Sequence, residues 1–206
     1  MSELYLRTLQ TAGVEAVQME AYGKVNALGN FAAEVDELGG SEISFIRDRD
    51  SFYMGSVGES GWPYVQHRGG KKGFLRVIDS RRLAFADLRG NRQLISTGNV
   101  GAESKVSLFL MDYKARERLK IIGRASVLSE DEAVAFSAEH LMEIENSAPR
   151  VFVIDVVAYD WNCPKYITPR FTREEVEEVV MPLRRRIQEL EEIVRSCELN
   201  EDPASR

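Results

Sequence analysis

Residues 63–73 read PYVQHRGGKKG, and this stretch sets the strand-and-turn pattern of the chain. The run that begins at Pro63 is rich in β-forming residues and presents Gln66, His67 and Arg68 in succession. Gly69 and Gly70, which carry no side chains, follow directly. Such a stretch is either an ordinary hairpin with a polar outer face or an edge against which something flat and polar lies. From this stretch alone, both interpretations stay open.

Short β-branched or aromatic runs continue on both sides of it, from position 51 onward. Turn sequences such as GESGWP, DSR and DYKARE separate these runs. Strands at such short intervals favour an antiparallel barrel or sandwich over βαβ units. The runs are SFYMGSV, PYVQH, FLRVI, RLAFAD, KVSLFLMD, RLKIIGRASVL and RVFVIDVVAYDW.

Helices are expected before, within and after this β-rich segment. Residues 1–40 read as helical and are interrupted by glycines, and Ser41 is predicted to cap a short helix. Two capping-box patterns predict further helix starts: Ser129 with Glu132, and Thr172 with Glu175.

The helix predicted after Thr172 has the most regular apolar pattern of the chain. Its β-branched a positions, with leucine at two of the d positions, favour a parallel two-stranded coiled coil. The alternative is an amphipathic helix that lies on its own barrel or on its neighbour's. Either way an apolar stripe has to be buried, which favours a homodimer, and Pro182 should kink or restart the helix. The a positions are Val180, Ile187 and Val194; the d positions are Val176, Leu183, Leu190 and Cys197.

The composition bounds the possible functions. The chain has 206 residues, 44% apolar and 29% charged, which suits one soluble core with appendages. A formal net charge of −6 argues against nucleic-acid binding. No apolar run approaches the roughly 20 residues that span a bilayer, and the N-terminus lacks a signal-peptide pattern. Cys163 and Cys197 lie outside any metal or CxxC spacing, so we expect a cytoplasmic protein with reduced thiols and no metal.

A second polar cluster follows the run RLAFAD, which ends at Asp87. Arg89, Gly90, Asn91 and Arg92 then arrive together before a short predicted helix. Guanidinium groups, a side-chain amide and backbone N–H groups at a helix start suit a phosphate, although a basic loop is more often plain solvated surface.

The remaining polar candidates are weaker. Arg118 and Lys120 are expected to share one face of a strand. His67 is interpreted as a hydrogen-bonding strand residue rather than a metal ligand or base, and His140 is given no role. Trp161 either packs in the core or provides an aromatic surface on which a ligand ring stacks. No nucleophile–base arrangement and no P-loop is present, so no residue is assigned as catalytic.

Several segments together resemble the pyridoxamine 5′-phosphate oxidase-related, FMN-binding split-barrel proteins, and more narrowly a branch with G-N-R-Q and W-N-C-P signatures. The resemblance covers about residues 41–172. It implies a split barrel over residues 41–171. The N-terminal helical extension (1–40) and the C-terminal amphipathic helix with its tail (172–206), both expected from the residues themselves, lie outside the resemblance. The segments are GWPYVQHRGG, GFLRVID, RRLAFADLRGNRQLISTGN, KVSLFLMDY, RLKIIGRA and DWNCPKYITPRFT.

The resemblance implies a mainly β fold with flanking helices, a six-stranded antiparallel barrel, and a homodimer that binds two FMN molecules between its subunits. Glycine at the ring would admit a close approach that a Cβ would block. The implied contacts are Gln66, His67, Arg68, Gly69 and Gly70 for the ring and ribityl, Phe85, Ala86 and Asp87 from the next paired strand, Asn91 and Arg92 for the phosphate, Arg118 from the following hairpin, and Trp161 from the partner subunit.

The function implied is that of an oxidoreductase in which flavin N5 exchanges hydride with a small substrate or a reduced nicotinamide, with Arg68 or Arg118 near the N1–C2 edge. Two features depart from the oxidase. Its phosphate loop carries Ser-Arg-Lys where this chain has Gly-Asn-Arg, and its substrate-binding tail cannot be aligned with NCPKYITPRF after Trp161. The substrate is therefore not implied. The alternatives are a non-catalytic flavin carrier or redox sensor, a barrel that binds deazaflavin or haem, and a purely structural dimer.

Overall fold

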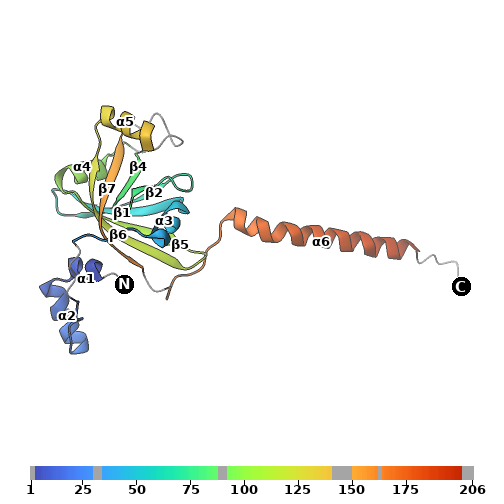
Figure 1. Ribbon diagram of the computed structural model, residues 1–206. Helices are drawn as coiled ribbons and strands as arrows, with labels where there is room; N and C mark the ends of the chain where they lie inside the picture. Colours follow the sequence, from blue (N-terminus) through green and yellow to red (C-terminus); the bar gives the residue numbers. More distant parts are fainter. Residues whose placement is uncertain (1–2, 30–33, 88–91, 141–149, 162–163, 201–206) are drawn as a thin grey trace. The chain divides into compact units, whose positions relative to one another are not determined.

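The computed structural model describes the chain except for residues 1–2, 30–33, 88–91, 141–149, 162–163 and 201–206 (Figure 1). The chain divides into two compact units. The first holds the β-sheet and most of the helices, and the second holds the C-terminal helix. No helix among the described residues combines the length and the apolar character that a membrane crossing requires. The first unit is Met1–Asp112 with Arg116–Ile167; the second is Tyr113–Ala115 with Thr168–Arg206.

Within the described residues, seven strands form a single antiparallel sheet in the order β2-β1-β5-β6-β7-β4-β3. Each of the runs predicted from the sequence overlaps one of them, and the mainly β class with flanking helices is confirmed. The expectation of six strands is wrong, because the four-residue β3 pairs with β4 and extends the sheet by one strand. The strands are β1 (Ser51–Val57), β2 (Pro63–Gly69), β3 (Arg76–Asp79), β4 (Arg82–Ala86), β5 (Lys105–Asp112), β6 (Glu117–Val127) and β7 (Val151–Trp161).

Six helices lie within the described residues, and both predicted capping residues bond the glutamate three positions later. The Thr172 N–H donates to Glu175 Oε2 at 2.9 Å, and the Glu175 N–H donates to Thr172 Oγ1 at 3.2 Å. At the other box, the Ser129 N–H and hydroxyl both donate to Glu132, and this hydrogen bonding lowers the pKa of the Glu132 carboxyl. The helices are α1 (Glu3–Leu9), α2 (Ala12–Tyr22), α3 (Gly40–Arg47), α4 (Ile95–Ala102), α5 (Glu130–His140) and α6 (Arg173–Asn200).

Two helix predictions are wrong in detail. The N-cap of α3 is Gly39 rather than Ser41, which lies inside the first turn. Glu42 reaches back to accept the Gly39 N–H at 2.9 Å, so the cap needs no side chain of its own. Pro182 does not restart a helix, because α6 runs unbroken through it.

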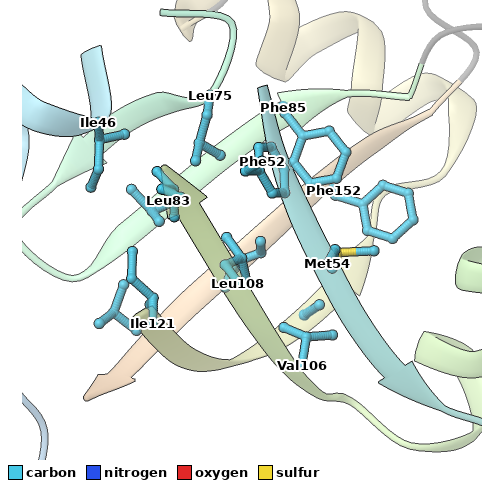
Figure 2. Packing of buried hydrophobic residues seen from close by; sticks show 14 of the residues in the cluster. Ile46, Phe52, Met54, Leu75, Leu83, Phe85, Val106, Leu108, Ile121 and Phe152 are labelled. Carbon is cyan, nitrogen blue, oxygen red and sulfur yellow. The ribbon is translucent and has the colours of Figure 1, made fainter. Parts of the chain in front are cut away.

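The sheet curls around one core. Phe52 on β1 meets Phe85 on β4 at 5.3 Å between ring centroids, and Phe85 stacks on Phe152 of β7 at 4.9 Å. Figure 2 shows these rings together with buried Met54 and Leu108. Since β1 and β4 are separated by three strands in the sheet order, their contact requires the sheet to bend back on itself. This bend brings the β2 edge close to the end of β4.

Residues of the predicted N-terminal extension belong to the same unit as the sheet. Leu4 and Tyr5 of α1 are buried with Ala158 of β7. The Lys120 ammonium lies 4.7 Å from the centroid of the Tyr5 ring and forms an ion pair with Asp160 at 2.9 Å. Burial raises the pKa of the Tyr5 phenol, and the negative charge of Asp160 raises it further. The N-terminal helix is therefore a packed part of this unit.

Candidate functional site

Strand β2 carries most of the predicted site, and it is an edge strand. Among the described residues it pairs with β1 alone, so its other backbone edge has no strand partner. Arg68 stands opposite buried Phe52 in the register, and Gln66 shares that face. His67 points to the other face of the sheet. The side chains of Gln66 and Arg68 therefore lie on one face of the sheet, and the side chain of His67 lies on the other.

Arg68 is held at the inner side of β2 by an ion-pair cluster. Its Nη1 donates to Asp87 Oδ1 at 2.7 Å, and Arg150 Nε donates to Asp87 Oδ2 at 3.0 Å. The Arg68 guanidinium carbon lies 5.4 Å from the Phe85 ring centroid and 5.2 Å from that of Phe152. Arg68 Nε is buried and has no hydrogen-bond partner among the residues that the structure describes. Two guanidinium groups against one carboxylate leave this cluster with an excess positive charge and an unused donor.

Helix α4 is tied to the same face of β2. The Ser96 hydroxyl, in the first turn of α4, donates to Gln66 Oε1 at 2.9 Å, and Ser96 is 1% exposed. Arg92 lies four residues before Ser96, is exposed and has a φ of 62°, in the left-handed region. Asn91, the other predicted phosphate contact, lies outside the described residues. The bond between Ser96 and Gln66 therefore places the start of α4 beside the predicted ring-binding strand.

The other face of the sheet holds a second group of predicted residues. The His67 and Tyr53 rings are 5.4 Å apart, edge to face. Tyr53 is the register partner of Phe109 on β5, and the Arg118 guanidinium carbon lies 5.9 Å from the Phe109 ring centroid. Arg118 Nε is buried, and no described residue forms a hydrogen bond with it. A single ligand that touches both Arg68 and His67 has to lie along the free edge of β2.

The two predicted glycines, Gly69 and Gly70, differ in how much space a Cβ atom or a ligand would have beside them. A Cβ at Gly70 would lie 2.7 Å from Cγ and 2.8 Å from Cβ of Phe74, so this glycine is required by the chain's own packing. A Cβ at Gly69 would lie 3.1 Å from the His67 ring, which can move, and 3.6 Å from the Asp50 carbonyl oxygen, an ordinary van der Waals contact. Gly69 is the better candidate for the close approach of a ligand.

Gly70→Ala is expected to cost about 1–3 kcal/mol of unfolding free energy, because the added methyl forces Phe74 out of its packing. Chemical denaturation measures this loss. Gly98→Ala is the matched control: nothing lies within 4 Å of its Cβ position, and it sits inside α4. That change should be neutral or stabilise by up to about 1 kcal/mol. Equal stability of the two variants would contradict the packing role of Gly70.

Three further predicted residues are placed by packing. Phe85 is 1% exposed and belongs to the core, and Ala86 is half-buried in a small cluster with residues of α5. Trp161 packs edge to face on Phe45 at 4.8 Å, and its indole N–H donates to Glu42 Oε1 at 2.6 Å. In the single chain, Trp161 is thus packed against the core. Whether it also contacts a cofactor of the partner subunit stays a prediction.

Two residues of the site were missed by the sequence reasoning. Arg150 lies directly before β7 and meets Asp87, which is 63 residues away. Ser96 meets Gln66 across 30 residues. Arg150 belongs to no recognisable motif. Ser96 lies inside the family-like segment RRLAFADLRGNRQLISTGN, but nothing in that segment pairs it with Gln66. The curl of the sheet and the docking of α4 bring both residues to the site.

The comparisons with known proteins point to one family. Residues 43–160 match the family model described as pyridoxamine 5′-phosphate oxidase, and this match covers more than half of the chain. It includes the whole of β1 to β6 and most of β7. α6 and the first two helices lie outside it. No curated protein shows significant similarity to the sequence.

Solved structures of low sequence identity match 60–65% of the chain. A protein from Lactobacillus delbrueckii, proposed to be a pyridoxamine 5′-phosphate oxidase, is 19% identical with a TM-score of 0.49 and covers 60% of this chain and 93% of its own. HupZ from Group A Streptococcus is 12% identical with a TM-score of 0.47, covering 65% and 100%. A Clostridium acetobutylicum protein related to general stress protein 26 is 11% identical with a TM-score of 0.44, covering 65% and 92%. At these values, the similarities carry no argument about function.

Proposed function

Because the chain belongs to the pyridoxamine 5′-phosphate oxidase family, we propose that it is an FMN-binding oxidoreductase that acts on a small substrate or a reduced nicotinamide. When bound, the flavin supplies the hydride chemistry, and the protein supplies binding, orientation and charge. The observation that carries the proposal is the hydrogen bond from Ser96 to Gln66, which joins the start of α4 to the free edge of β2. These are the two surfaces that a phosphate and a planar polar ring require.

The ring side fits the cofactor. The pyrimidine edge of a flavin is a row of donors and acceptors, and an unpaired strand edge presents a row of N–H and C=O groups. Arg68 adds a buried Nε donor that no residue in the described part of the chain accepts from, and Asp87 fixes its guanidinium in place. A cation so placed would stabilise negative charge on a reduced ring. No side chain is assigned a proton-transfer role.

The proposal for the phosphate rests on the positive charge of Arg92 and on the N-terminus of α4. Arg92 and the first turn of α4 would hold the phosphate, together with Asn91. An arginine fork matches phosphate oxygens, and a helix N-terminus adds positive potential. The buried Asp87 carboxylate is already engaged by two guanidinium groups and would not repel the anion strongly.

We further propose a cytoplasmic homodimer with FMN between its subunits. The outer face of β1 and β2 exposes large apolar side chains, with Val65 64% and Tyr53 41% exposed. A cavity of about 530 Å³ opens on this face between α1 and the strands β1, β2, β5 and β6. An apolar face of this kind supports coverage by a second subunit.

The cofactor is tested by purifying the protein and recording its visible spectrum, followed by a fluorescence titration with FMN. A yellow protein, or saturable quenching, is expected. A colourless protein that leaves FMN fluorescence unchanged would end the proposal. A Soret band from protein purified with haem available would instead favour haem, with His67 as the histidine to replace.

Arg92→Ala is expected to weaken FMN binding by about 1.5–3 kcal/mol, which is roughly 10- to 150-fold in Kd, since a charged hydrogen bond to phosphate is lost. Titration of the folded variant gives this value. Arg195→Ala on the exposed surface of α6 is the control and should bind FMN as the unmodified protein does. An unchanged affinity in Arg92→Ala would move the phosphate elsewhere.

Turnover separates an enzyme from a carrier or sensor. The bound flavin is expected to lose its visible absorbance when NADH, NADPH or another cellular donor is added without oxygen. A flavin that binds tightly but is never reduced by such donors would favour the carrier.

A further inference from the structure

The helix α6 lies outside the part of the chain that matches the family, and its apolar stripe is open. In the single chain the exposed fractions of five stripe residues lie between 45% and 58%. A helix that displays such a stripe needs a partner surface. The five residues are Val176 at 48%, Leu183 at 58%, Ile187 at 54%, Leu190 at 45% and Val194 at 55%.

We propose that α6 pairs with α6 of a second copy as a parallel, in-register two-stranded coiled coil. Valine and isoleucine fill the a positions Val180, Ile187 and Val194, and leucine fills the d positions Leu183 and Leu190. β-branched residues at a with leucine at d are the combination that selects two parallel strands. The 28-residue helix is about 42 Å long, which gives the seam several consecutive layers.

Pro182 does not interrupt this seam. It occupies a c position, which faces away from the partner helix in a two-stranded coil. The hydrogen bond that it lacks would reach the carbonyl of Glu178, at an f position on the outer side of the helix. α6 is continuous through Pro182, so the a and d residues on both sides of it belong to one stripe.

The charges beside the stripe complement each other between copies. Arg186 is a g residue, and Glu191 is the e residue five positions later. In a parallel pair each g side chain faces the e side chain of the next heptad on the other helix, so two Arg186–Glu191 pairs form. In the single chain Arg186 bonds the neighbouring Glu189 at 2.9 Å while 63% of its side chain stays exposed, so it is free to reach across.

Cys197 provides a way to test the register of the two α6 helices. It is an exposed free thiol at a d position near the end of α6. In a parallel in-register pair the two Cys197 side chains face each other, whereas an antiparallel pair places Cys197 opposite Val180. The separation of facing d residues is within the range that a disulfide can bridge after small adjustments.

The test uses the full chain with Cys163→Ser, so that Cys197 is the only thiol. Diamide oxidises two facing thiols to a disulfide and takes up their two protons and two electrons, and a non-reducing gel measures the rate. At roughly 10 μM protein, cross-linking is expected to be about 100-fold faster than in the control, because facing thiols have a millimolar effective concentration. The control carries Cys163→Ser, Cys197→Ser and Ser196→Cys, which moves the thiol by one residue to the outward c position.

Equal rates for the two thiols would overturn the proposal, because they would mean random collision. Rapid cross-linking that appears only when Val180→Cys is combined with Cys197 would replace the parallel pair by an antiparallel one. A dimer formed through the sheets alone brings the chains together without aligning Cys197, so it predicts no preference for Cys197 over the control. The flavin proposal is not involved in any of these readouts.

The charge pairing gives a second, independent check. Arg186→Glu should slow the cross-linking of Cys197 severalfold, and Glu191→Arg in the same chain should restore it. Arg184→Glu is the matched control, since Arg184 faces Val179 in the parallel pair. Rescue of Arg184→Glu, rather than of Arg186→Glu, by Glu191→Arg would favour the antiparallel arrangement.

Discussion

Asp87→Asn is expected to lower the free energy of unfolding by about 3–5 kcal/mol, the scale found when one partner of a buried ion pair is removed. Asp87 is 4% exposed and accepts from Arg68 at 2.7 Å and from Arg150 at 3.0 Å. An asparagine of the same shape would turn an amide NH₂ toward one of these guanidinium groups. Both partly buried cations would then lack their counter-charge, with side chains 13% and 26% exposed for Arg68 and Arg150. Urea denaturation followed by circular dichroism gives the loss directly.

Asp79→Asn makes the same chemical change at an exposed pair. Asp79 bonds Arg82 at 2.7 Å, and their side chains are 42% and 51% exposed. Water screens such a pair, so the expected loss is below about 1 kcal/mol. If Asp87→Asn were no more destabilising than Asp79→Asn, the Arg68–Asp87–Arg150 cluster would not be holding β2 against the ends of β4 and β7.

The elements of the fold were predictable from the sequence to different degrees. The strands were predictable because each is a short β-branched or aromatic run bounded by turn residues, and the capping boxes located two helix starts. The N-cap of α3 was misplaced because Glu42, not Ser41, satisfies the first turn from within the helix. β3 was recognised as a run, yet the family resemblance led to a count of six strands.

The site was predictable only in part. Gln66, Arg68 and Asp87 could be named from the family-like motifs, and Gln66 and Arg68 do share one face. Their partners could not be named, since Arg150 and Ser96 meet them through contacts distant in the sequence. The alternation of side chains along a strand separates His67 from its two neighbours, and this period-2 rule needs only the sequence of β2.

Glu42→Ala is expected to destabilise the first unit by about 1–4 kcal/mol, because the Trp161 indole loses its acceptor, at about 1–3 kcal/mol, and the capping bond to the exposed Gly39 N–H is lost, at up to about 1 kcal/mol. Glu42 is 7% exposed, and its oxygens accept from the Trp161 indole at 2.6 Å and from the Gly39 N–H at 2.9 Å. Burial raises the pKa of the nearby Tyr159 phenol, and the negative charges of Glu42 and Asp36 raise it further. The pKa of Tyr159 should therefore fall in the variant, which a spectroscopic tyrosine titration measures.

A double-mutant cycle with Trp161→Phe separates the two roles considered for this tryptophan. Denaturation of the single and double variants should give a coupling energy of about 1.5–3 kcal/mol between Glu42 and Trp161, the value for a hydrogen bond to a charged group. A coupling near zero would contradict the anchoring of Trp161 by Glu42. FMN affinity, measured on the folded Trp161→Phe variant, then carries independent information. If Trp161 only fills the core, Trp161→Phe lowers the free energy of unfolding and leaves the FMN affinity unchanged. If Trp161 also contacts the cofactor of the partner subunit, the substitution lowers both.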